Sequence, residues 1–235
     1  METNWKKGRI VKTKIIDLAA SYKLNEARKL GVYCVKFNGD YMVVGLRNSD
    51  IKILNSKTYD RVKTLTGHKS GVHCIELNDK IIISGSSDST IKIWDISTGN
   101  CLNTLYNHSQ SVMSLKLNGN TLVSCSMDKS IFVYNIENLN SVKLIKNLTN
   151  DPKLNELDLR CNTVDINDDF IIAGIYNKIK VWENKSDYQL VSSLNGHESI
   201  ITCLYMLNSF VISGSQDKTV SRIENVFSCS TKFYL

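Results

Sequence analysis

Three sets of histidine, serine and aspartate recur along the chain at the same spacing. The first set is His68, Ser84 and Asp88, and Trp94 follows it. An imidazole, a hydroxyl and a carboxylate are the groups of a serine hydrolase, in which the imidazole takes the proton of a nucleophilic hydroxyl. The other sets are His108, Ser124 and Asp128 with Tyr134, and His197, Ser213 and Asp217 with Ile223. An enzyme needs one nucleophile in one pocket, so the repetition favours a structural role in each copy.

The elements that position the first set lie between Gly67 and Ile96. This stretch holds three runs of β-branched and apolar residues, which are Val72–Leu77, Lys80–Gly85 and Thr90–Asp95. Turn signals, Asn78-Asp79 and Ser86-Ser87-Asp88, separate these runs. The pattern predicts three antiparallel strands joined by tight turns.

The remainder of the chain repeats this unit. The position of Trp94 is taken in the other units by Leu54, Tyr134, Trp182 and Ile223, so the period is about 40 residues. A longer interval precedes Trp182, and the added residues fall in a loop that contains the only proline, Pro152. Insertions of this kind are tolerated in loops. The sequence therefore predicts five units of four strands each.

Units of this period that open with Gly-His and close with Trp-Asp resemble WD repeats, which implies a β-propeller. In WD repeats the tryptophan, serine, histidine and aspartate form a buried hydrogen-bonded chain that ties the strands to their loops. The resemblance implies that these residues are structural, and no G-x-S-x-G motif points to a hydrolase. We expect no catalytic residue and no enzyme activity. All four residues of this hydrogen-bonded set are present in the second unit. In the fourth unit Ala173 replaces the serine, and in the fifth unit Ile223 replaces the tryptophan.

The predicted fold is all-β, with about five four-stranded blades, which is incomplete relative to a seven-bladed ring. Residues 1–30 are expected to form an N-terminal strand, Arg9–Leu18, and a linker. The propeller is expected to span residues 31–235. The approximate blades are 31–65, 67–105, 108–146, 158–194 and 196–235.

Composition limits the other functions. Apolar residues make up 42% of the chain, but no run is long enough for a membrane span, and the N-terminus lacks the apolar core of a signal peptide. We expect a protein of the cytoplasm or nucleus that binds no membrane. The net charge of +6 arises partly from five basic residues between positions 6 and 14. We interpret these residues as a solvated basic strand. No aromatic stacking platform accompanies them, so nucleic-acid binding is not expected.

The seven cysteines are an odd number in a chain expected to lie in a reducing compartment, which argues against a disulfide framework. Cys34, Cys74 and Cys203 hold the same place in three units and are expected to be small core residues. No CxxC pair occurs, so no zinc or other metal site is expected. No cofactor is predicted.

Four segments narrow the resemblance, and they are NWKKGRI, GVYCVKF, VVGLRNSDIKI and ISGSSDSTIKIWDISTGNCLNTL. They resemble the β-transducin-repeat-containing (Slimb-type) F-box/WD proteins. Members of that family are substrate receptors of SCF ubiquitin ligases, whose propellers bind doubly phosphorylated Asp-Ser-Gly degrons. The resemblance implies a non-catalytic protein-interaction module, with ubiquitin transfer left to other subunits.

Three residues match degron-contacting positions of that family. Strand order places Tyr33, near the start of a first strand, and Arg47, after a second strand, on one rim. Ser87 is the counterpart of Arg47 in the next unit. The resemblance implies that Arg47 pairs with a phosphate or carboxylate, that Ser87 donates a hydroxyl, and that Tyr33 adds a polar tip to an apolar wall.

The chain also departs from the family. Gly71 replaces a serine, Met127 a lysine, Ser199-Ile200 an arginine and glycine, and Gln216 a serine, and the last two blades are missing. No F-box precedes the first matching segment, so no docking on Skp1 is expected. Two alternatives therefore stay open. One is a general WD-repeat scaffold without a ligase role, and the other is a non-functional truncated fragment.

Overall fold

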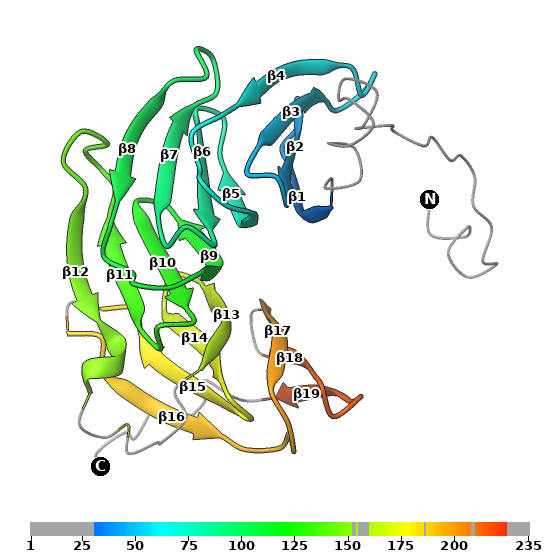
Figure 1. Cartoon of the computed structure of the whole chain (residues 1–235). Helices are drawn as coiled ribbons and strands as arrows, with labels where there is room; N and C mark the ends of the chain where they lie inside the picture. The colour runs from blue at the N-terminus through cyan, green and yellow to red at the C-terminus, as the bar shows by residue number, and fades with distance from the viewer. Residues whose placement is uncertain (1–30, 152–153, 155–159, 186, 208–209, 225–235) are drawn as a thin grey trace. The chain divides into compact units, whose positions relative to one another are not determined.

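The computed structural model describes residues 31–151, 154, 160–185, 187–207 and 210–224. These residues form five antiparallel sheets, each of which is one propeller blade (Figure 1). The all-β prediction is confirmed, since the one helical element described is the short 3-10 helix η1 (Leu148–Asn150). The segment 1–30, with its predicted strand Arg9–Leu18, and residues 225–235 at the end of the predicted fifth blade lie outside the described residues.

In each blade the strands pair as antiparallel neighbours in chain order. Blade 1 contains β1 (Val32–Phe37), β2 (Tyr41–Leu46), β3 (Ile51–Asn55) and β4 (Arg61–Leu65). Blade 2 contains β5 (Val72–Leu77), β6 (Ile81–Ser86), β7 (Ile91–Asp95) and β8 (Cys101–Leu105). Blade 3 contains β9 (Val112–Asn118), β10 (Thr121–Ser126), β11 (Ile131–Asn135) and β12 (Lys143–Asn147). Blade 4 contains β13 (Cys161–Ile166), β14 (Phe170–Ile175), β15 (Lys178–Glu183) and β16 (Leu190–Leu194). The described strands of blade 5 are β17 (Ile201–Leu207), β18 (Phe210–Ser215) and β19 (Val220–Glu224).

The turns form where the sequence carries short polar side chains. The Asn78 Oδ1 atom accepts a hydrogen bond from the backbone N–H of Ile81 at 3.0 Å, which closes the turn between β5 and β6. Ser89 adopts a φ of 65° in the next turn, between β6 and β7, and Lys129 adopts 73° at the same place in blade 3. An asparagine that folds onto its own backbone thus sets the register of the hairpin.

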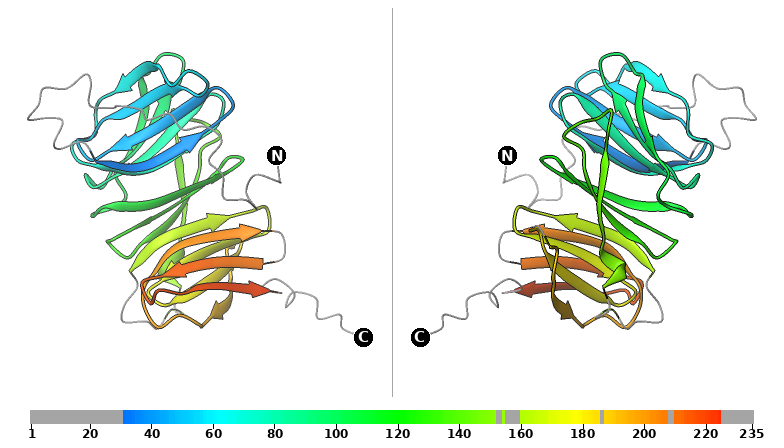
Figure 2. Two further views of the ribbon diagram at one scale, coloured as in Figure 1. Left: turned by 90° about the vertical axis from the view of Figure 1, so that its right-hand side faces the viewer. Right: turned by 90° about the vertical axis from the view of Figure 1, so that its left-hand side faces the viewer.

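The core lies between neighbouring blades, because the sheets of blades 2, 3 and 4 each bury one face against the preceding blade and the other against the next. Trp94 and Ile82 of blade 2 pack with Ile53 of blade 1. Ile83, on the opposite face of blade 2, packs with Leu122 of blade 3. Figure 2 shows the five sheets following one another in chain order. The strands are short, so each blade depends on its neighbours for burial.

The cysteine prediction is confirmed for one residue of three. Cys74 is buried, Cys34 is half-buried, and Cys203 is exposed. Burial raises the pKa of the Cys34 thiol to about 12 and also raises that of Cys74. Cys203 differs because it lies on the face of blade 5 that points away from blade 4, and no further sheet follows blade 5 in the described part of the chain.

Within the described ranges, no helix is both long and apolar enough to cross a membrane. The same ranges contain no cluster of three or more histidine, cysteine, aspartate or glutamate side chains arranged to hold a metal ion.

Candidate functional site

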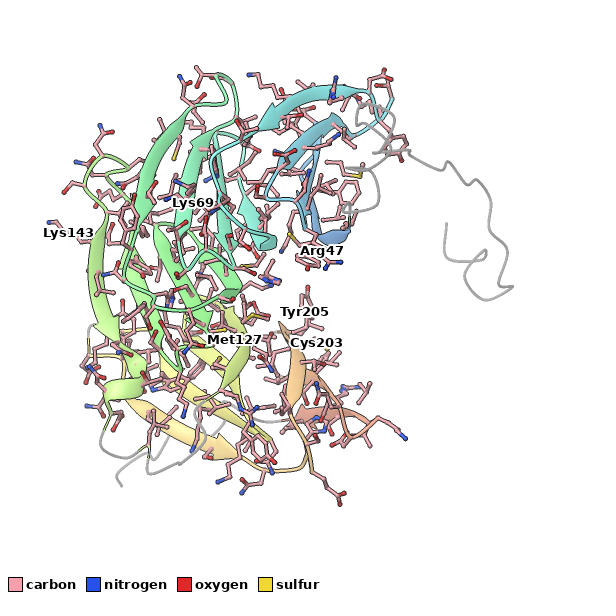
Figure 3. All side chains as sticks on the ribbon, viewed as in Figure 1. Arg47, Lys69, Met127, Lys143, Cys203 and Tyr205 are labelled. Carbon is pink, nitrogen blue, oxygen red and sulfur yellow. The ribbon has the colours of Figure 1, made fainter. Side chains whose placement is uncertain are left out.

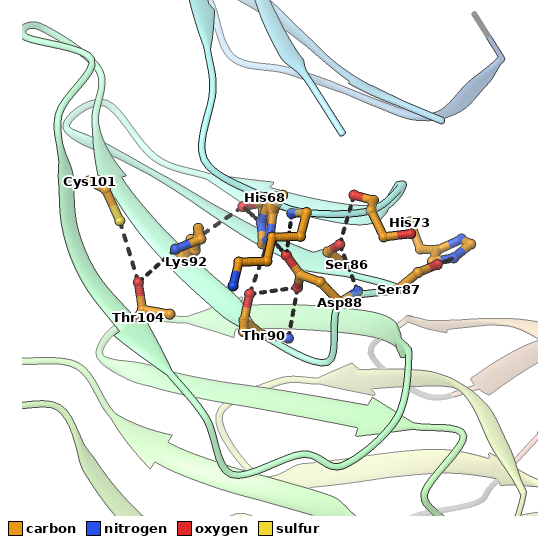
Figure 4. Close-up of polar contacts among 12 residues, drawn as sticks. His68, His73, Ser86, Ser87, Asp88, Thr90, Lys92, Cys101 and Thr104 are labelled. Atoms are coloured by element: carbon orange, nitrogen blue, oxygen red, sulfur yellow. Dashed lines mark hydrogen bonds and ion pairs between the residues drawn. The ribbon is translucent and has the colours of Figure 1, made fainter. Parts of the chain in front are cut away.

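The histidine, serine and aspartate of blade 2 form the hydrogen-bonded chain that the WD-repeat resemblance implies. Figure 4 shows the part of this network around His68, Asp88 and Thr90. The Trp94 Nε1–H donates to Ser84 Oγ at 2.8 Å. The Ser84 hydroxyl therefore directs its own proton to His68 Nε2, also at 2.8 Å. The His68 Nδ1 atom carries the remaining ring proton and donates it to Asp88 Oδ2 at 2.9 Å. Because Ser84 is fully buried, its hydroxyl is a structural link and is closed to a substrate.

The surroundings keep the imidazole neutral and the carboxylate charged. Burial lowers the pKa of His68. Burial alone would raise the pKa of Asp88, but hydrogen bonds from the Thr90 hydroxyl and from the backbone N–H groups of Lys69 and Thr90 together lower it to about 2. Thr90 is thus a further member of the network that sequence reasoning missed. Ser130 in blade 3 and Thr219 in blade 5 make the same hydrogen bond to the aspartate two residues before them. The recurrence of a hydroxyl residue at this position was the signal in the sequence that could have revealed Thr90.

The other blades keep parts of this network. In blade 3 His108 bonds to Ser124 at 2.7 Å, but the buried Tyr134 hydroxyl has no hydrogen-bond partner within the described ranges. In blade 5 His197 bonds to Ser213 at 2.8 Å, and Ile223 supplies no donor.

Blade 4 lacks the serine. Its Trp182 Nε1 is buried without a hydrogen-bond partner in the described structure, since Ala173 stands where blade 2 has Ser84. The predicted ranking of blade 2 as the complete copy is confirmed.

A second repeated feature builds the rim at one end of the blades. The backbone N–H of Arg47 donates to the carbonyl of Gly31 at 2.7 Å, and that of Ser87 donates to the carbonyl of Gly71 at 2.9 Å. The same bond joins Met127 to Ser111, Tyr176 to Arg160 and Gln216 to Ile200. Arg47 and Ser87 therefore hold equivalent positions in neighbouring blades, directly after the second strand of each.

A ring stack links the two blades at this rim. The rings of Tyr33 and His73 lie parallel, with centroids 4.7 Å apart and an interplanar angle of 6°. The His73 Nε2 atom is 2.5 Å from Ser87 Oγ. Gly71 makes room for this arrangement, because a Cβ there would lie 2.7 Å from the Tyr33 ring. Sequence reasoning missed His73, because a ring stack between two blades leaves no signal in the residue spacing within either blade.

Arg47 completes what we call the rim site, made of Tyr33, Arg47, His73 and Ser87. Its side chain is exposed (Figure 3). Among the described residues its guanidinium has no ion-pair partner. Gly71 lies between Tyr33 and Arg47, since a Cβ built on it would also lie 3.2 Å from the Arg47 carbonyl oxygen. Burial lowers the pKa of His73, which leaves Arg47 as the permanent cation of the site.

The residues that depart from the family pattern occupy the same rim in later blades. Met127 is 47% exposed at the position equivalent to Arg47 in blade 3, and Gln216 holds that position in blade 5. Arg160, which sequence reasoning did not select, is exposed at the equivalent of Gly31 in blade 4 and already has an interaction partner. Met127 and Gln216 therefore add no positive charge to the rim.

Antiparallel four-stranded sheets, stacked face to face and tied by the Trp–Ser–His–Asp network, define WD-repeat propeller blades. The family model described as "WD domain, G-beta repeat" matches residues 59–95, 99–135 and 188–221. The third strand of blade 4 lies outside these matches, in agreement with its loss of the serine. WD repeats are protein-interaction modules, and WD-repeat proteins are in general non-catalytic scaffolds.

Individual proteins show the same relationship. The F-box/WD repeat-containing protein lin-23 of Caenorhabditis elegans is 35% identical over 68 residues, which span 29% of this chain and 9% of that protein. A crystal structure of the computationally designed Ika8 protein aligns with a TM-score of 0.70 and 26% identity, over 82% of this chain and 58% of that one. The designed Ika4 protein aligns with a TM-score of 0.59 and 27% identity, over 68% of this chain and 94% of that one.

Proposed function

We propose that this interaction module binds a phosphorylated segment of a partner protein at the rim site. The observation that carries the proposal is Arg47, an exposed guanidinium without an ion-pair partner among the described residues. A guanidinium of this kind pairs with two oxygens of one phosphate. The Tyr33 ring and the Arg47 backbone both lie next to Gly71, and Ser87 Oγ contacts the His73 ring that stacks on Tyr33. In this proposal Ser87 supplies a hydrogen-bonding group and Tyr33 an apolar wall.

The same site favours one phosphate over two. A phosphate group carries a charge of about −1.5 to −2 near neutral pH. Met127 and Gln216 offer no positive charge at the rim positions of blades 3 and 5. We therefore infer that a singly phosphorylated or acidic peptide suits this rim better than a doubly phosphorylated one.

The partial similarity to an F-box/WD repeat-containing protein supports a further proposal, that the chain derives from the substrate-recognition subunit of a ubiquitin ligase. In that case the peptide would belong to a protein marked for ubiquitin-dependent proteolysis. The second candidate is a general WD-repeat scaffold without a ligase role. The exposed Met127 favours it, since an apolar group at the rim suits an unphosphorylated partner.

Binding of labelled Asp-Ser-Gly peptides, measured by fluorescence anisotropy, tests the site. We expect phosphorylated peptides to bind the wild type and Arg47→Glu to weaken binding by about 10- to 100-fold, because one charge-assisted contact is lost and a repulsive one is added. The matched control is Arg61→Glu, which makes the same charge change on the outer strand β4 and should bind like the wild type.

The unphosphorylated peptide separates the two candidates. Tighter binding of the phosphorylated form supports the proposed site, whereas equal affinity for both forms favours the scaffold. Equal binding of the phosphorylated peptide by the wild type and Arg47→Glu would overturn the assignment of Arg47.

A further inference from the structure

A pocket of about 210 Å³ lies between blades 4 and 5, away from the rim site. Its lining comes from β15, from β16 and the loop that follows it, from β17 and from β19. Four of the lining residues are aliphatic, and they are Ile179, Leu194, Ile201 and Ile223. The others are Gly196 and the polar residues Asn177, Asn195, His197, Ser221 and Arg222, so the walls combine apolar and polar groups.

Each of these walls has a counterpart around the buried Trp94 of blade 2. Ile179 pairs with Leu194 in the sheet register, as Ile51 pairs with Leu65 in blade 1. Ile223 stands opposite Val211, as Trp94 stands opposite Ile82. The pocket thus occupies the place of the Trp94 side chain in blade 2.

The glycines of Gly67-His68 and Gly196-His197 show how much more space Ile223 leaves in blade 5 than Trp94 leaves in blade 2. A Cβ built on Gly67 would lie 3.1 Å from Cη2 of Trp94, so the indole fills the space up to the loop. A Cβ built on Gly196 would have no atom within 4 Å. The pocket is therefore the volume that an indole occupies in blade 2 and that Ile223 leaves empty in blade 5.

We propose that this pocket is a binding site for a free aromatic heterocycle of the size of indole. A fully apolar cavity of about 150 Å³ is known to take up benzene. This pocket, of about 210 Å³, is larger and has the volume for a fused bicyclic ring beside its aliphatic residues. Leu194 and Ile179 supply the apolar contacts, and burial of the ring supplies the driving force. The ligand would fill the interface between two blades, so binding should stabilise the fold.

Thermal unfolding with indole as the probe tests this site. Millimolar indole should raise the Tm of the wild type by about 2–4 °C. Ile223→Trp fills the pocket from β19 and should raise the Tm without ligand while abolishing the response to indole. Ile223→Leu keeps the side-chain volume and should respond like the wild type.

A second blocking variant guards against misfolding of Ile223→Trp. Gly196→Leu fills the same space from the opposite wall, where the structure leaves room for a side chain. Chemical-shift changes of Ile methyl groups on indole titration should centre on Ile179 and Ile223 in the wild type and vanish in this variant. The absence of any response in the wild type would overturn the proposal, as would an equal response in the wild type and both blocked variants.

Discussion

Ser84 and Ser213 hold the same position in blades 2 and 5, but only Ser84 has an indole beside it. Ser84 accepts a hydrogen bond from Trp94 and donates one to His68, whereas Ser213, among the side chains that the structure describes, has the histidine contact alone. Both side chains are fully buried, so water cannot replace a lost partner. The pair therefore separates the value of the indole bond from that of the imidazole bond.

We expect Ser84→Ala to lower the free energy of unfolding by about 2–4 kcal/mol, because two buried polar groups lose a partner. Ser213→Ala should cost about 1–2 kcal/mol, because one group does. Urea denaturation of both variants measures the difference. Equal losses would show that the Trp94 hydrogen bond adds nothing to stability.

Blade 4 offers the reverse experiment. The buried Trp182 Nε1 lacks an acceptor in the part of the chain that the structure describes, and Ala173 lies in the register of Ser84. We expect Ala173→Ser to stabilise the protein by about 1 kcal/mol by providing that acceptor. Ala173→Cys is the control of similar size, since sulfur accepts hydrogen bonds weakly. A serine variant no more stable than the cysteine variant in urea denaturation would argue against the new bond.

At the scale of elements, the stability of blades 2 and 3 depends on neutral histidines. In each blade the histidine joins the loop before the first strand to the turn after the second strand, through Asp88 in blade 2 and Asp128 in blade 3. Burial lowers the pKa of both His68 and His108, so the unfolded chain binds protons that the folded chain does not. Stability is then fully present above the ordinary histidine pKa near 6.5 and falls as the pH drops below it. The pKa of Asp88 is lowered to about 2, so its contribution persists until the pH falls below about 4.

We therefore expect two separate losses of stability on acidification. Below about pH 6.5, each buried histidine lowers the free energy of unfolding by up to about 1.4 kcal/mol per pH unit until the pH reaches its own lowered pKa. Below about pH 4 the carboxylates of the network add to the loss. Urea denaturation at a series of pH values tests this, with His68→Gln expected to reduce the slope of the first phase. An unchanged slope in that variant would exclude His68 as its source.

The sequence predicted those features that repeat or that depend on neighbours in the chain. The strand β5 (Val72–Leu77) and its turn at Asn78 follow from alternation and local side-chain bonding. The hydrogen-bonded network follows from the spacing shared by three units and the family it resembles. Features that join two blades were not predictable in this way. The stack of Tyr33 on His73 and the exposure of Cys203 depend on which face meets which neighbour.

At the scale of the whole described unit, the two faces of blade 5 differ. Leu204 and Val211 are buried against blade 4. The other face presents Tyr205, which is 54% exposed, and Val220, which is 76% exposed. The equivalent of Val220 in blade 2, Ile91, is 1% exposed because blade 3 packs on it. The exposed face thus keeps the apolar character of an interior one.

This face should make the 235-residue chain self-associate, because exposed apolar sheet surface is removed from water when two copies meet. We expect the double variant Tyr205→Lys, Val220→Lys to contain more monomer than the wild type in sedimentation velocity. The difference should remain at high salt, because the lost contact is apolar. Val62→Lys is the matched control, since Val62 is 47% exposed on the outer strand β4. If all proteins, including the wild type, sediment as monomers at the same concentrations, the face is not an association surface. If the control dissociates as fully as the double variant, added charge rather than this face accounts for the change.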